Sequence, residues 1–182
     1  MDFQAVTTFA KEVLLESGEC HPTVFVEVEG DASPYILPFI TFPFRTTEER
    51  ERGLFAAARH FARKVRKQIK GKKIIHLAFA CEGWGAQVQK TDEWVRPSRH
   101  PARKEVLFIT MLDIATMKQE MSVFEMLRAG ESIDLVAMME KPDEVQSSLL
   151  PAFLTGIQTV EQDEGMARAK LRRVCEEYGV QR

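Results

Sequence analysis

The 182-residue chain lacks the features of secreted, disulfide-rich and membrane-spanning proteins. Its three cysteines, Cys20, Cys81 and Cys175, are odd in number and far apart, so no disulfide framework is indicated. The first residues hold no basic segment followed by an apolar core, so a signal peptide is not expected. No apolar run approaches the roughly 20 residues that a membrane-spanning helix requires. We therefore expect a soluble, cytoplasmic protein without a membrane partner.

The sequence also lacks the common catalytic and metal-binding signatures. It has no P-loop, no Gly-x-Ser-x-Gly and no Gly-x-Gly-x-x-Gly, and the run Glu82-Gly83-Trp84-Gly85 is only superficially similar to a phosphate loop. No cysteine or histidine pair has the spacing of zinc ligands. We expect no metal and no cofactor. His76 lies within an apolar run, which favours a hydrogen-bonded sheet residue over a catalytic base.

The first half of the chain predicts a helix, two strands and a long helix. Asp2 can cap a first helix that Gly18 ends, and residues 23–29 alternate as in a strand. Residues 35–42 predict its hairpin partner, with Pro38 at an edge or a bulge. The clearest element is a helix over 47–70 with a capping box at Thr46 and Glu49. Its predicted buried stripe is Leu54, Ala58, Phe61, Val65 and Ile69.

The second half predicts four strands and then helices. Residues 73–82 and 105–113 are apolar on both faces, as in central strands, and 118–128 with 132–140 resemble a hairpin. The spacing of Met117, Met121, Phe124 and Leu127 would also suit a helix. A further helix is expected from Pro142, kinked or ended by Pro151.

This order of elements predicts an α+β fold. We expect an antiparallel or mixed sheet of five to six strands, with helices packed mainly on one face. A single domain over residues 1–158 would precede a C-terminal amphipathic helix or tail over 159–182. The order loosely resembles the layered roadblock and profilin-type folds, without a family motif that would imply a function.

The net charge of −2 hides a basic middle between two acidic flanks. Residues 45–104 carry sixteen basic and six acidic side chains. On a helix, Arg63, Arg66 and Lys70 lie opposite the apolar stripe and could neutralise phosphates. The alternative interpretation is a solvated outer face, partly paired with nearby acids, because the outer faces of helices in soluble domains are polar.

A second basic region is the predicted connection over residues 83–104. It is longer than most loops, which favours a functional or a disordered segment. Aromatic rings beside guanidinium groups can stack on bases and bind phosphates, or form a protein interface. The loop could instead pack its own tryptophans over the edge of the sheet. The candidate binding residues here are Trp84, Trp94, Arg96, Arg99 and Arg103.

One pair of carboxylates supports an enzymatic alternative. Glu82 and Asp113 each end an apolar strand. Parallel neighbouring strands would place both at one edge of the sheet, where they could bind a metal or act as acid and base. Antiparallel strands would place them at opposite ends.

These features lead to two functional hypotheses. The first is a non-enzymatic binding or assembly protein that uses the basic helix face and the Trp/Arg-rich loop to bind nucleic acid or an acidic protein surface, which could belong to a second copy of the chain. The alternative is a small enzyme with a carboxylate-based pocket near Glu82 and Trp84. The sequence identifies no catalytic residue.

Overall fold

The computed structural model describes residues 1–39, 47–69, 71–86, 99–130, 132–140, 149–160 and 162–163. The fold is α+β with a six-stranded antiparallel sheet, which confirms the predicted fold class and number of strands. The chain forms two compact units. One contains Met1–Phe42 and Lys72–Ser147, and the other contains Pro43–Gly71 and Ser148–Arg182.

The first unit begins with helix α1, Phe3–Ser17, as the sequence predicts. The Asp2 side chain accepts a hydrogen bond from the backbone N–H of Gln4, and so satisfies one of the free donors at the helix start. Gly18 ends the helix with φ 76°, a left-handed conformation that glycine adopts without steric cost. Val6, Ala10 and Leu14 are buried at helical spacing.

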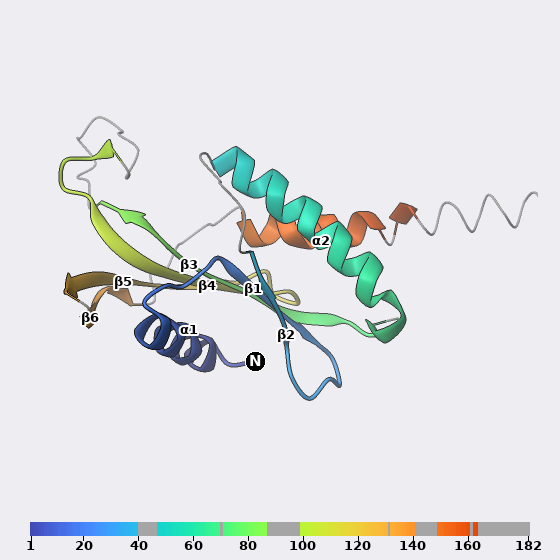
Figure 1. Ribbon diagram of the computed structural model, residues 1–182. Helices are drawn as coiled ribbons and strands as arrows, with labels where there is room; N and C mark the ends of the chain where they lie inside the picture. Colours follow the sequence, from blue (N-terminus) through green and yellow to red (C-terminus); the bar gives the residue numbers. More distant parts are fainter. Residues whose placement is uncertain are drawn as a thin grey trace, which may run out of the picture. The chain divides into compact units, whose positions relative to one another are not determined.

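The sheet has the strand order β2-β1-β3-β4-β5-β6 (Figure 1). Every neighbouring pair is antiparallel, and β3 and β4 are central, as predicted. The strands are β1 Thr23–Val28, β2 Tyr35–Pro38, β3 Ile74–Gly85, β4 Lys104–Asp113, β5 Gln119–Ala129 and β6 Ser132–Glu140.

The β5–β6 hairpin is present, and the helical alternative for residues 118–128 is wrong. Phe124 and Met126 are buried, whereas Glu125 between them is only partly buried and Leu127 is exposed. Burial therefore alternates with the period of a strand. The apolar spacing was ambiguous because residues four apart, such as Met117 and Met121, share a face in a helix and in a strand alike. The observed pairing with β4 on one side and β6 on the other shows that this segment is a strand.

Strand β2 forms one edge of the sheet and ends at Pro38, so the predicted edge position of this proline is confirmed. Proline has no N–H to donate to a neighbouring strand. Phe39 is described but lies beyond the strand, and 40–42, the rest of the predicted strand, lie outside the described residues.

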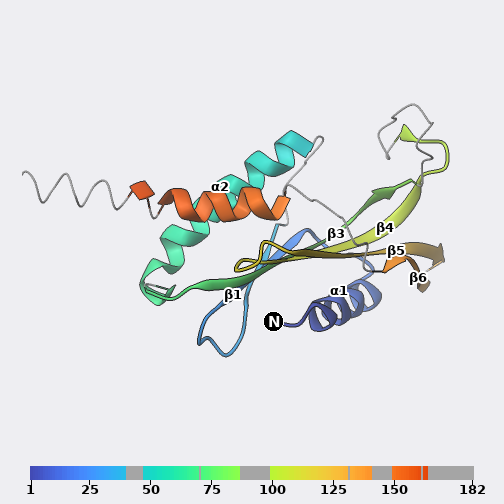
Figure 2. The same cartoon turned by 180° about the vertical axis from the view of Figure 1, so that it is seen from behind.

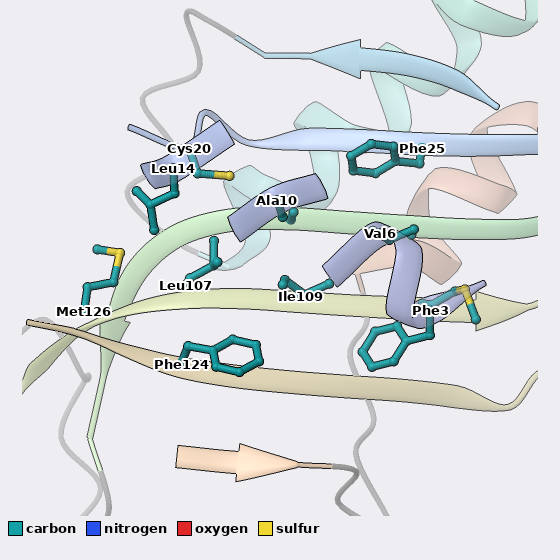
Figure 3. Packing of buried hydrophobic residues seen from close by; sticks show 13 residues of the cluster. Phe3, Val6, Ala10, Leu14, Cys20, Phe25, Leu107, Ile109, Phe124 and Met126 are labelled. Atoms are coloured by element: carbon teal, nitrogen blue, oxygen red, sulfur yellow. The ribbon is translucent and has the colours of Figure 1, made fainter. Parts of the chain in front are cut away.

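The core of the first unit lies between α1 and one face of the sheet (Figures 1 and 2). Figure 3 shows Phe3, Val6, Ala10 and Leu14 of the helix directed at side chains of the strands. The sheet contributes Phe25, Ala78, Ala80, Leu107, Ile109, Met111, Phe124 and Met126. A buried Leu, Ile or Phe side chain contributes about 1.5–3 kcal/mol by leaving water, so this layer is a major source of stability.

The second unit pairs helix α2, Thr47–Ile69, with a helix over residues 149–160. The ring centroids of Phe61 and Phe153 are 6.4 Å apart. The helices are in close contact at Gly156, where a Cβ atom would lie 2.5 Å from the Phe55 carbonyl oxygen and 2.8 Å from the Ala58 Cβ. Gly156 thus permits contact between the two helix backbones.

The sequence predictions for the second unit have mixed outcomes. Leu54, Ala58, Phe61 and Val65 are buried as predicted, and Ile69 is partly buried. Pro151 was expected to end or kink a helix. It does not end one, because residues 149–160 are helical on both sides of it. The proline ring conflicts only with the preceding turn, so the helix can continue after it.

Some predictions about the ends of segments lie outside the described residues. These include the capping role of Thr46, the helix start at Pro142 and most of the tail over 159–182. The single domain over 1–158 stays a prediction. Within the described residues, no helix combines the length and apolar content required to cross a bilayer.

Candidate functional site

The most distinctive exposed group in the described residues is a tryptophan stacked with an arginine at one end of the central strands. Trp84 is 45% exposed, and the guanidinium carbon of Arg103 lies 5.0 Å from its ring centroid. This distance is within the range of a cation–π interaction. We call Trp84 and Arg103 the Trp84–Arg103 surface.

The backbone register brings these two residues together. Strand β3 continues through Trp84 to Gly85, so Trp84 belongs to a strand and not, as expected, to the loop. It pairs with Glu105 in β4, which places it next to the residues that precede that strand. The backbone N–H of Arg103 donates to the carbonyl of His100 at 3.1 Å, closing a turn that directs the chain into β4.

Of the other candidate residues of the predicted loop, the structure describes Arg99 but not Trp94 and Arg96. Arg99 is exposed and His100 is partly buried. The His100 Nδ1 atom accepts a hydrogen bond from the backbone N–H of Ala102 at 3.1 Å, which fixes the turn further. Trp94 and Arg96 lie outside the described residues.

The basic helix face is partly neutralised within its own unit. Arg63 and Lys64 are exposed on α2. Arg59 forms an ion pair with Asp163 at 3.1 Å, and its guanidinium carbon lies 5.8 Å from the ring centroid of Phe55. Arg66 lies in α2, but the structure does not describe its side chain, and Lys70 lies outside the described residues.

Glu82 connects three segments of the first unit. One carboxylate oxygen accepts from the backbone N–H of Cys20, and the other accepts from the Arg128 guanidinium at 3.1 Å. Arg128 also donates to Glu105 at 2.9 Å and to the carbonyl of Gly18 at 3.0 Å. Both carboxylate oxygens of Glu82 are thus engaged in joining β3 to β5 and to the segment between α1 and β1.

The antiparallel pairing of β3 and β4 removes the basis for a site shared by Glu82 and Asp113. Asp113 is in register with His76, six residues from Glu82 along β3. At about 3.3 Å per residue, the two positions are roughly 20 Å apart. Because β3 and β4 are antiparallel, the two carboxylates lie at opposite ends of the strands, which is the second of the two arrangements considered from the sequence.

A second polar cluster, which the sequence did not reveal, lies at the opposite end of the central strands. Glu27, His76 and Asp113 occupy neighbouring strands in register. The Nδ1 atom of His76 is 2.6 Å from Glu27, and its Nε2 atom is 3.5 Å from Asp113. His76 is therefore a hydrogen-bonded sheet residue, as predicted. The sequence did not predict its two partners, Glu27 and Asp113.

The environment of the carboxylates in this cluster shifts their pKa values. Burial raises the pKa of Glu27, but hydrogen bonds from the amine of Met1 and from His76 outweigh it and hold the pKa below its usual value. Hydrogen bonds from Thr116, chiefly from its backbone N–H, lower the pKa of Asp113. Both groups are thus stabilised as anions beside His76.

The cluster is not suited to hold one metal ion, because its two carboxylates contact opposite nitrogens of the same imidazole ring. No group of three or more His, Cys, Asp and Glu side chains in the described ranges is arranged as a metal site. Cys20 is buried and unbridged, and burial, with a smaller contribution from Glu82, raises the pKa of its thiol to about 11. The thiol is therefore protonated at neutral pH and a poor ligand.

Comparison with known proteins gives no assignment: no protein-family model, no curated protein and no solved structure matches this chain. These comparisons give no support to the loose similarity to roadblock and profilin-type folds. The geometry of the described residues must therefore carry any functional proposal.

Proposed function

We propose that this protein is a non-enzymatic binding protein that engages an anionic partner, and that the partner is single-stranded nucleic acid. The observation that carries the proposal is the Trp84–Arg103 surface, an exposed indole with a guanidinium group over its ring. The proposed contact residues also include Arg99, on the turn before Arg103.

An exposed tryptophan beside arginine has the chemistry required for a flexible polyanion. Stacking of a base on an aromatic side chain contributes about 1–3 kcal/mol, and every base offers a ring to stack. Guanidinium groups bind phosphate oxygens through two parallel hydrogen bonds. Trp84 and Arg103 could thus contact a base and its adjacent phosphate together.

The nearby acidic groups oppose such binding less than their number implies. Glu82 and Glu105 both form ion pairs with Arg128, and Lys104 forms one with Glu125 at 2.6 Å. Two cations thus offset two of these three negative charges. Arg103 and Arg99 add positive charge at the same end of the strands.

The second unit supplies a further basic face. Arg63 and Lys64 are exposed on α2 and would attract phosphates through electrostatics. In the proposal, Arg63, Arg66 and Lys70 strengthen binding without reading the sequence of the nucleic acid. Trp94 and Arg96 are further proposed contacts.

The enzymatic alternative, a pocket near Glu82 and Trp84, has weaker support. Both oxygens of Glu82 accept hydrogen bonds that hold the fold together. An acid or base for catalysis must instead reach a substrate proton. We therefore assign Glu82 a structural role.

The test measures binding of a fluorescently labelled oligo(dT) to the full chain by anisotropy over a range of salt concentrations. Contact with about four phosphates should give a log–log salt slope near −3. Trp84→Ala should weaken binding by about tenfold at every salt concentration, because base stacking does not depend on counterion release. The combined Arg63→Ala, Arg66→Ala and Lys70→Ala variant should instead flatten the slope.

Ile36→Ala is the matched control, because Ile36 is 48% exposed on edge strand β2 and lacks an aromatic ring. It should bind like the wild type. Absence of binding at low salt would refute the nucleic-acid proposal. Binding of polyglutamate that depends on Trp84 would identify an acidic protein surface as the partner instead, since Trp and Arg are also enriched at protein interfaces.

A further inference from the structure

Among the described strands, the last one, β6, is an edge of the sheet of a different kind from β2. It spans nine residues, Ser132–Glu140, and ends the strand order beside β5. It contains neither proline nor a basic residue, whereas β2 has four residues and ends in Pro38. Short strands, prolines, lysines and β-bulges protect sheet edges from pairing with another chain. Of these, β6 has only a register shift opposite Val123 and Phe124, which leaves Met138, near the end of the strand, outside the pairing with β5.

Apolar side chains reach this edge on both faces of the sheet. Ile133 and Leu135 are partly buried and pack against the core beneath α1. On the opposite face, Val136 is 47% exposed and Leu127 is 46% exposed. Val136 pairs with Glu125, which lies two residues from Leu127 along β5, so the two exposed side chains are diagonal neighbours on one face.

From this edge we infer that β6 pairs antiparallel with β6 of a second copy of this chain, about a twofold axis at Val136. In this register Val136 faces its own copy and Leu135 faces Ala137, on the regular part of β6 before the register shift at Met138. No two acids are opposed, whereas an axis at Asp134 would place two carboxylates together, which is destabilising. The shared edge joins two sheets and covers Val136 with an identical side chain, as an isologous interface requires.

The inference is independent of the nucleic-acid proposal, because it concerns other residues and another measurement. Sedimentation velocity of the full chain should show a monomer–dimer equilibrium that shifts with protein concentration. Val136→Lys and Val136→Glu should each raise the dimer Kd by at least about tenfold, because each places like charges face to face. An equimolar mixture of the two variants should restore the dimer through the opposed charges.

Ile36→Lys introduces the same charge at a similarly exposed position on the β2 edge and should leave the dimer unchanged. Val136→Cys retains a small side chain and should form a disulfide-linked dimer on mild oxidation, which Ile36→Cys and the parent chain should not. A wild type that stays monomeric overturns the inference, whatever else covers β6. So does a mixture of the charged variants that remains monomeric.

Discussion

The two ends of the central strands use charged residues differently. At the end with Glu27, His76 and Asp113, the charged groups contact one another in register across three strands. At the other end, Arg128 joins Glu82 and Glu105, while Trp84 and Arg103 stack beside them at the surface. The first end serves the fold, and the second combines an ion-pair network with an exposed tryptophan and arginine.

The largest effect should come from Arg128→Ala. It removes the donors to Glu82, Glu105 and the Gly18 carbonyl together, and leaves a half-buried Glu82 carboxylate without its cation. We expect a loss of about 2 kcal/mol in the free energy of unfolding, measured with urea. Arg128→Lys should recover only part of it. A loss below about 0.5 kcal/mol would show that this network is not structural.

Glu27→Gln should have an intermediate effect with a specific pH dependence. The folded state lowers the pKa of Glu27 below 4.5, so ionised Glu27 stabilises the fold above that pH. We expect Glu27→Gln to cost about 1 kcal/mol at pH 7.

The difference between wild type and Glu27→Gln should shrink as the pH falls from 4.5 through the lower folded pKa, where the wild-type carboxylate takes up a proton. Urea unfolding at a series of pH values measures it. A difference that grows on acidification would contradict the assigned contacts.

The smallest effect on stability should come from Trp84→Ala. Trp84 is 45% exposed at the end of a strand, so its removal should cost less than about 1 kcal/mol and leave the pH dependence unchanged. Urea unfolding of this variant, beside Arg128→Ala, separates the exposed surface from the structural network at the same end. A loss larger than that of Arg128→Ala would make Trp84 a core residue and weaken its assignment to binding.

The elements of the fold could be predicted from the sequence because their signals are local. Asp2 and Gly18 mark the ends of α1, and the alternation of Val24, Val26 and Val28 marks β1. The turn between residues 129 and 132 likewise indicates the β5–β6 hairpin. Each of these signals depends on residues close together in the chain.

The polar clusters could not be predicted because they depend on strand register. Glu27 and His76 are 49 residues apart, and Glu82 and Arg128 are 46 apart. A shift of one residue in register would move each side chain to the other face of the sheet. The exposed stacking of Trp84 also depends on the extension of β3 beyond Glu82, which the two flanking glycines obscured in the sequence.

The contact at Gly156 has a consequence for engineering. Replacing a helical glycine with alanine is a standard route to a more heat-resistant protein, because alanine favours the helix by about 1 kcal/mol. Here the added methyl group would lie 2.5 Å from the Phe55 carbonyl oxygen, and backbone atoms cannot yield as a flexible side chain can. A thermostabilised version of this protein should therefore retain glycine at this position and seek its gains elsewhere.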